Sequence, residues 1–276
     1  MFTPVRDLDS AQCNFLTSEL SKLDNKVGAK ALHVQFKVGL TQAEALEYVI
    51  NDSPMLWAKT YLNWEARDYQ KDILNQGKKA KKLVLRLGRR LGKTEDMCIL
   101  ILWHCFARPN MGKNQTVYDV LILTPFETQV DLIFKRLNQL IDQSQLLMQE
   151  LDNRIQHKIK FKGEVTITGL TLGVKSGSQG ANTRGQRADL IIYDEVDYAD
   201  SPTITNTMNI RNEAPDRIKV IAASTPCGKR EEFYKWCTEA TTRIMAKEED
   251  INSFKFTGYE TIYNADGNGW TNKKAS

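Results

Sequence analysis

The stretch Leu83-Val-Leu-Arg-Leu-Gly-Arg-Arg-Leu-Gly-Lys-Thr94 decides the fold. Its first part, Leu83 to Leu87, is apolar apart from one arginine and predicts a buried strand. The residues from Thr94 to Phe106 predict a helix. Backbone N–H groups at the start of a helix, together with one lysine, can bind the phosphates of a nucleotide. The sequence therefore predicts a phosphate-binding loop between these two elements.

The glycine spacing of this loop differs by one position from the common phosphate-loop pattern. A pattern G-x-x-x-x-G-K-[ST] that ends at Thr94 requires glycine where Leu87 stands, and the glycine is Gly88 instead. Gly-Lys-Thr is a weak tripeptide by itself. The alternative is a strand-to-helix turn in which threonine caps the helix. A second motif is needed to decide between the two.

The second motif is Leu190-Ile-Ile-Tyr-Asp-Glu195, an apolar strand that ends in two carboxylates. Alternation along the strand sends these side chains in different directions. Asp194 can then reach Mg²⁺ through water, while Glu195 reaches a water in line with a γ-phosphate. Alone, the pair is typical of a solvated turn. Together with an upstream phosphate loop it predicts hydrolysis of ATP or GTP.

Two further segments are expected beside these motifs. Ala223-Ser-Thr-Pro226 follows the predicted strand Val220–Ala223, and ligands of open α/β sheets bind at the carboxyl ends of strands. We interpret it as a sensor of the γ-phosphate. The polar, glycine-rich stretch of residues 175–187 precedes the acidic strand, and Arg184 or Arg187 there could stabilise transition-state charge. For Arg187 we favour an ion pair with a carboxylate such as Asp189.

The remaining pattern predicts an α/β fold, because short apolar runs alternate with helical stretches. Residues 1–53 are expected to be helical, with a capping box at Thr41 to Glu44, and residues 55–75 form a second helical segment. The other predicted elements are a strand at 118–123, a helix at 130–141, antiparallel strands within 155–168, a helix at 231–240 and a strand at 254–259.

Composition limits the class of protein. The chain has 276 residues, of which 41% are hydrophobic and 26% are charged. We therefore expect a substantial core that does not depend on disulfides, and the composition is not that of a disordered protein. The net charge of +4 permits a nucleic acid as partner without requiring one. Five cysteines at irregular spacing predict reduced thiols and no zinc site. The longest apolar run, Met97 to Phe106, is too short to span a membrane.

Four motifs in their order resemble the ATPase domain of the large terminase subunits of tailed bacteriophages. They are Tyr69-Gln-Lys-Asp-Ile73, Arg89-Arg-Leu-Gly-Lys-Thr94, Leu190-Ile-Ile-Tyr-Asp-Glu195 and Ser224-Thr-Pro226. In that family the phosphate loop departs from standard glycine spacing and carries an arginine. The resemblance implies a RecA-like P-loop NTPase with a mostly parallel sheet and an additional strand between the two nucleotide motifs. It implies a helical N-terminal extension (1–53), an ATPase core (54–228) and a small lid with the start of a linker (229–276).

The resemblance also implies roles for individual residues. Lys93 binds phosphate, Thr94 and Asp194 hold Mg²⁺, and Glu195 orients the attacking water. The nucleotide-binding set is Gln70, which reads adenine, with Gly88, Arg89, Arg90, Leu91, Gly92, Lys93 and Thr94. Ser224, Thr225 and Pro226 form a coupling motif. Arg184 and Arg89 are the two candidates for an arginine finger.

The function implied is Mg²⁺-dependent ATP hydrolysis that drives double-stranded DNA into a procapsid, in the host cell cytoplasm. The implied partners are DNA, a portal protein and a small terminase subunit, with a homo-oligomeric ring on assembly and a monomer in isolation. Large terminases usually carry a C-terminal nuclease, and we expect no DNA cleavage by this chain. Two alternatives stay open: a helicase-type translocase, and a nucleotide-binding module without turnover.

Overall fold

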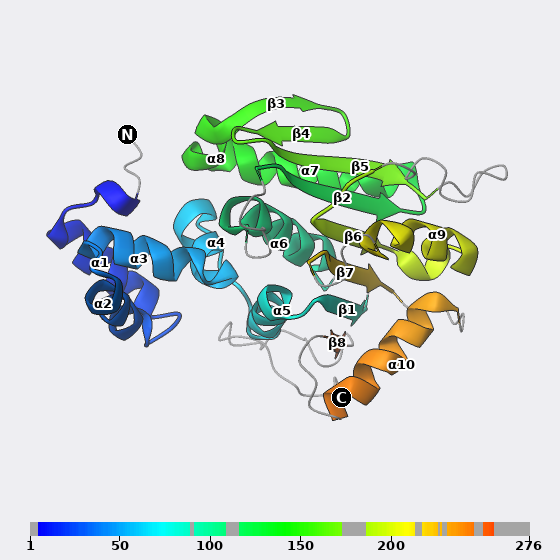
Figure 1. Ribbon diagram of the computed structural model, residues 1–276, viewed down its shortest axis with the longest axis horizontal. Helices are drawn as coiled ribbons and strands as arrows, with labels where there is room; N and C mark the ends of the chain where they lie inside the picture. The colour runs from blue at the N-terminus through cyan, green and yellow to red at the C-terminus, as the bar shows by residue number, and fades with distance from the viewer. Residues whose placement is uncertain are drawn as a thin grey trace, which may run out of the picture.

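An eight-stranded sheet runs through the molecule in the strand order β3-β4-β5-β2-β6-β7-β1-β8 (Figure 1). The computed structural model describes residues 5–88, 91–108, 116–172, 186–212, 217–225, 227, 231–245 and 251–256. The strands are β1 (Lys82–Leu87), β2 (Tyr118–Thr124), β3 (Leu151–Ile155), β4 (Lys158–Phe161), β5 (Val165–Thr171), β6 (Leu190–Asp194), β7 (Lys219–Ser224) and β8 (Ile251–Phe256).

Helices surround this sheet. They are α1 (Ser10–Ser21), α2 (Val27–Val38), α3 (Gln42–Asn51), α4 (Pro54–Leu62), α5 (Asp68–Lys79), α6 (Lys93–Ala107), α7 (Glu127–Gln143), α8 (Gln145–Glu150), α9 (Ser201–Asn212) and α10 (Glu232–Met245), with short 3-10 turns η1 (Val5–Asp7) and η3 (Val196–Tyr198). None of the helices in the described ranges is long and apolar enough to cross a bilayer.

Strand pairing confirms the expected fold class. Five strand pairs are parallel: β5–β2, β2–β6, β6–β7, β7–β1 and β1–β8. The pairs β3–β4 and β4–β5 are antiparallel. The strand β7 lies between β1, which precedes the phosphate loop, and β6, which carries the acidic pair. This is the additional strand between the two nucleotide motifs.

Both faces of the central strands are buried. Along β1, Leu83, Leu85 and Leu87 pack into a core that includes residues of helices α3 to α7. Val84, between them, points to the other face, where the core includes residues of η3, α9 and α10. Alternation therefore sends successive side chains of one strand into two different cores, which is why the central strands are almost wholly apolar.

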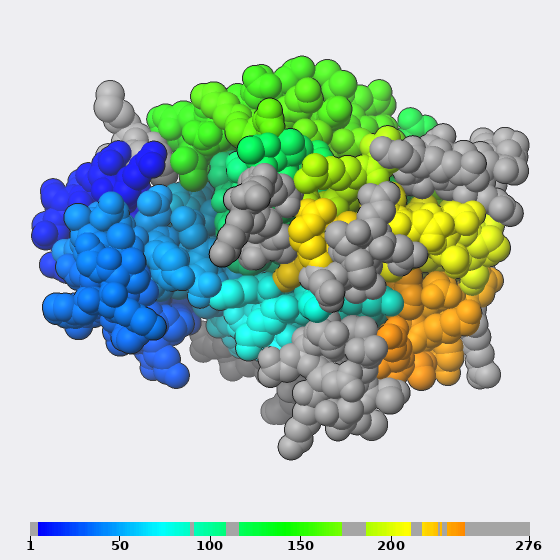
Figure 2. Space-filling view, in the orientation of Figure 1, coloured from blue at the N-terminus to red at the C-terminus, as the bar shows by residue number. Residues whose placement is uncertain are grey.

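The N-terminal helices form a lobe at one end of the molecule, next to α4 (Figure 2). The predicted capping box at α3 is present, since the Thr41 hydroxyl accepts from the Glu44 N–H and the Glu44 carboxylate accepts from the Thr41 N–H. The prediction of one helical segment over residues 55–75 is wrong. Helix α4 ends at Leu62, and Asn63, with φ +48°, turns the chain before α5 begins.

Several other elements differ from expectation. The antiparallel strands extend beyond residues 155–168, because β3 begins at Leu151 and β5 continues to Thr171. The last strand lies at 251–256 instead of 254–259, and it joins the main sheet beside β1. Helix α9 was not expected, because residues 201–212 are mostly polar and carry no clear apolar stripe.

Gly169 marks a close contact between β5 and α7. A methyl group at this position would stand 2.5 Å from Cε2 of Phe134 and 2.6 Å from Cγ1 of Val130. We expect Gly169→Ala to lower the free energy of unfolding by about 1–3 kcal/mol, because the buried ring must shift. Urea unfolding measures this, with Thr168→Ala on the opposite strand face as control. Equal stability of Gly169→Ala and wild type would contradict the contact.

Candidate nucleotide-binding site

The site lies where β1, β7 and β6 end. Gly92 is the N-cap of α6 and has φ +76°, a backbone conformation that glycine adopts without steric cost. It follows that Lys93 and Thr94 stand on the first turn of α6, whose free N–H groups and dipole favour an anion. This is the place at which the sequence predicts the phosphate loop.

The Lys93 side chain joins the three strand ends. Its Nζ donates to Glu195 Oε1 at 2.7 Å and to Thr225 Oγ1 at 3.0 Å. Only 9% of the Lys93 side chain and 20% of the Glu195 side chain are exposed. The structure therefore brings together three residues that are separated by up to 132 positions in the sequence.

Glu195 is held by the coupling motif as well as by the lysine. Its Oε2 accepts from the Thr225 backbone N–H at 3.2 Å and from the Ser224 hydroxyl at 3.3 Å. The backbone of Glu195 is left-handed, with φ +50°, which costs a non-glycine residue roughly 1–2 kcal/mol. The turn directs the carboxylate back across the end of β7, and the hydrogen bonds offset part of the strain.

Asp194 has the character expected of a cation ligand. It is buried at 2% exposure, and its Oδ1 has no hydrogen-bond partner. Burial raises its pKa to about 6, with the Glu195 charge adding to the effect and Lys93 opposing it. A buried carboxylate oxygen without a donor is suited to a hard divalent cation. Asp194 and the hydroxyl of Thr94, a residue of the first turn of α6, are groups whose chemistry suits Mg²⁺.

Helix α5 supports the phosphate loop from behind. The Tyr69 hydroxyl donates to the Leu91 carbonyl at 2.8 Å, and Gln70 Nε2 donates to Asp96 Oδ1 at 2.6 Å. Gln70 Oε1 accepts from the Arg67 N–H at 3.0 Å, so both ends of its amide are used inside the protein. Asp96 is fully buried, and burial holds its pKa well above the usual value.

A residue that the sequence analysis missed ties the strand ends together. Asp197 is buried in η3; its N–H donates to Ser224 Oγ at 3.2 Å and its Oδ2 accepts from the Cys227 N–H at 2.7 Å. It connects the turn after β6 to the turn after β7. In the sequence, Asp197 is distinguished by its position two residues after Glu195. An exposed acidic residue could stand at the same position, so the sequence does not reveal that Asp197 is buried.

Several predicted site residues lie outside the described residues: Arg89, Arg90, Arg184 and Pro226. Gly88 directly follows β1, as expected. Arg187 pairs with a carboxylate, as we favoured, but the carboxylate is that of Asp119 and not that of the example, Asp189. Its Nε is 3.9 Å from Asp119 Oδ2, whereas the fully buried Asp189 pairs with Arg217.

Comparison with known proteins gives a family match. The family model described as the N-terminal part of the terminase large subunit of the T4likevirus type matches residues 84–274. No protein of curated function matches the chain in sequence.

Solved structures with the same fold include three phage proteins. The HK97 bacteriophage large terminase superposes with a TM-score of 0.58 at 15% identity, over 78% of this chain and 45% of that one. The large terminase ATPase domain of Thermus phage P74-26 gives 0.50 at 20% identity, over 67% and 74%. The large terminase of another thermophilic bacteriophage, in complex with ADP, gives 0.50 at 15% identity, over 69% and 45%. The chain thus spans less than half of the HK97 protein.

The buried Asp194 predicts a pH-dependent stability. Its pKa of about 6 exceeds the ordinary value of 3.8, so the native state keeps a proton that the unfolded chain loses. Stability from this group is full below about pH 4 and is lost as pH rises to about 6. We therefore compare the free energy of unfolding of Asp194→Asn with that of wild type, both in EDTA. This difference should be more favourable to the variant at pH 7.5 than at pH 4, by roughly 2–3 kcal/mol. Urea titrations at both pH values test it, with exposed Asp152→Asn as control; an equal difference at both pH values would contradict it.

The contacts of Gln70 predict how its loss affects binding. Because its amide holds helix α6 and the N–H of Arg67, we expect Gln70→Ala to weaken ATP, GTP and inorganic tripolyphosphate equally, by about tenfold (~1–2 kcal/mol). Isothermal titration of all three ligands measures this, with Asp72→Ala on the same helix as control. A loss confined to ATP would instead assign adenine reading to Gln70.

Proposed function

This chain belongs to the terminase large subunit family, and on that premise we propose that it hydrolyses Mg²⁺-ATP to drive double-stranded DNA into a viral procapsid. The observation that carries the proposal is the contact of Lys93 with Glu195 and Thr225 at the joined ends of three parallel strands. A lysine on a helix N-terminus, a carboxylate and a hydroxyl are the groups that phosphoryl transfer to water uses.

We expect ATP binding to break the ion pair between Lys93 and Glu195. Lys93 donates to Glu195 in the structure, and a γ-phosphate at the start of α6 competes for the same Nζ. When Lys93 turns to the phosphate, Glu195 loses its strongest partner and keeps the donors from Ser224 and Thr225. Glu195 is then free to orient a water and accept its proton. Thr94 and Asp194 would hold Mg²⁺, which would supply positive charge beside the phosphates when bound.

The coupling motif transmits this change. Ser224 and Thr225 donate to Glu195, and Ser224 also accepts from the N–H of Asp197, which in turn holds Cys227. A movement of the Glu195 carboxylate therefore reaches the chain after β7, which leads to α10 and β8. We propose that residues 229–276 act as a lid that converts this movement into movement of DNA.

The finer assignments follow the family. Arg184 or Arg89 completes the site as an arginine finger, and Gly88 to Thr94 bind the phosphates. We propose that the chain divides into an extension (1–53), a core (54–228) and the lid. It acts in the host cytoplasm, as a ring that forms on a portal protein with a small terminase subunit, and it is a monomer in isolation.

The first test is the Glu195→Gln variant. It keeps the side-chain shape but removes the base and the ion pair, so we expect ATP binding at least as tight as wild type and phosphate release slower by about 100-fold or more. Phosphate release and nucleotide binding are measured in parallel over a range of protein concentrations. Exposed Glu127→Gln is the matched control.

The outcomes separate the competing functions. Phosphate release by Glu195→Gln at the wild-type rate would remove Glu195 from the mechanism. Wild-type protein that binds ATP without any turnover, with portal and DNA present, would favour the nucleotide-binding module. Separation of a forked duplex would favour the helicase-type translocase.

A further inference from the structure

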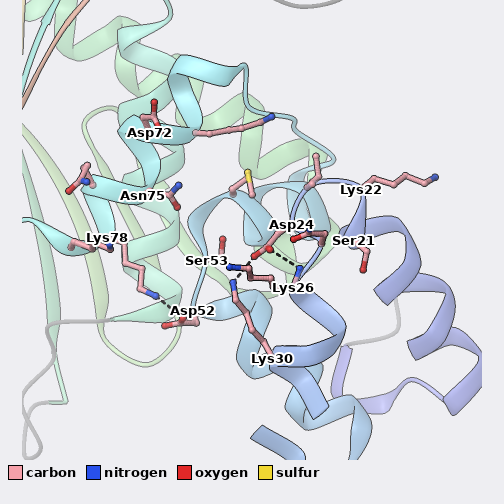
Figure 3. A pocket seen from close by; sticks show the side chains of 16 residues that line it. Ser21, Lys22, Asp24, Lys26, Lys30, Asp52, Ser53, Asp72, Asn75 and Lys78 are labelled. Carbon is pink, nitrogen blue, oxygen red and sulfur yellow. Dashed lines mark hydrogen bonds and ion pairs between the residues drawn. The ribbon is translucent and has the colours of Figure 1, made fainter. Parts of the chain in front are cut away.

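A wide groove separates the turn between α1 and α2 from helix α5 (Figure 3). It has a volume of about 930 Å³. One wall is the segment Ser21–Lys26 with Lys30 of α2, the floor is the junction of α3 and α4, and the other wall is the exposed side of α5 from Lys71 to Lys79. The groove lies apart from the nucleotide site, which no lining residue contributes to.

The lining concentrates positive charge. It contains six lysines, Lys22, Lys26, Lys30, Lys71, Lys78 and Lys79, and three aspartates, Asp24, Asp52 and Asp72. The whole chain has a net charge of only +4. Glu19 and Asp68, next to the lining, pair with Lys22 and Lys71, so four of the six lysines are in ion pairs and the groove keeps a small positive excess. A positively charged concave surface raises the local concentration of an anion.

Two of the aspartates fix lysines in position. Asp24 accepts from Lys30 Nζ at 2.6 Å, and Asp52 accepts from Lys78 Nζ at 2.6 Å (Figure 3). Lys26 and Lys79 are exposed, and neither Nζ has a carboxylate within ion-pair distance among the residues that the structure describes. These two ammonium groups, on opposite walls, are available to an anion.

The other lining groups identify the kind of anion. They are the amides Asn25, Asn75 and Gln76, the hydroxyls Ser21 and Ser53, and only two apolar side chains, Leu23 and Met55. Lysines, amides and hydroxyls are the groups that contact phosphate oxygens of DNA. Single strands are bound by stacking on aromatic rings, and protein partners by aromatic and arginine anchors. The lining of this groove has neither.

We propose that this groove binds the phosphate backbone of duplex DNA without reading its sequence, an inference that rests on the proposed DNA-packaging function. The charged donors of the lining are all lysines, which contact phosphates as point charges, and the lining, among the residues that the structure describes, has no arginine, whose planar fork binds in a bidentate way. The aspartates reduce the excess charge and keep the contact weak. A weak, sequence-independent contact permits DNA to be held and released repeatedly.

The test is binding of a fluorescent 30-base-pair duplex at several salt concentrations. Lys26→Gln/Lys79→Gln removes the two available charges, so its slope of log affinity against log salt should be smaller than wild type by about 2. The control Lys37→Gln/Lys160→Gln removes two exposed charges from outside the groove and should keep the wild-type slope. ATP hydrolysis without DNA is measured for all three proteins and should be equal.

Three results would overturn the groove assignment. They are an equal loss of slope in both double variants, an unchanged slope in the groove variant, and groove-dependent binding of a single strand as tight as that of the duplex. Each of these results can occur whether or not the protein hydrolyses ATP without DNA, so the groove assignment can fail without the proposed ATPase activity failing. Wild-type protein that binds the duplex through the groove but does not hydrolyse ATP would leave this inference standing and remove the proposed motor function.

Discussion

The hydrogen bonds that hold β1, β7 and β6 in one parallel register are the constraint on which every polar group of the site depends. Ala223 of β7 stands opposite Leu85 of β1 on one side and opposite Asp194 of β6 on the other. Ser224 and Thr225, the next two residues, therefore emerge between the phosphate loop and the acidic pair. A register slip of one residue would turn each side chain to the other face of the sheet and separate Lys93 from its partners. Burial on both faces, by two distinct cores, makes such a slip costly.

Helix α5 connects the two candidate sites physically. At its start, Tyr69 and Gln70 contact the phosphate loop and α6. At the end of α5, the carbonyls of Gly77 and Lys78 accept hydrogen bonds from Nζ of Lys219, the first residue of β7. The distance to the Gly77 carbonyl is 3.1 Å, and Lys78 also lines the groove. Burial and the Lys78 charge lower the pKa of Lys219 to about 8. Helix α5 is thus hydrogen-bonded to the nucleotide site at one end and to the central sheet at the other. The groove described above runs along its exposed side.

Sequence patterns were reliable where local chemistry and burial act together. The strands β1, β2, β6 and β7 and the helix that begins at Lys93 lie where expected. The periodicity of their apolar residues and the polar residues at their ends were enough to predict them. The break at Asn63 carries no proline or glycine, so an αL residue between two aromatic-rich stretches was not recognisable. The partners of Gln70 and Asp197 were unpredictable for a different reason. The contacts Gln70–Asp96 and Asp197–Cys227 span 26 and 30 positions and depend on how two elements pack, which no spacing in the sequence records.

The left-handed backbone at Glu195 sets the cost of backbone strain against the contacts of the side chain. Only glycine adopts such a backbone freely, so the backbone strain taken by itself favours glycine at this position. Glycine would relax the turn but would also remove the carboxylate that Lys93, Ser224 and Thr225 all contact. The turn after β6 therefore holds a chemical group in a backbone conformation that costs free energy, and no substitution can relax this backbone without also removing the contacts that the group makes.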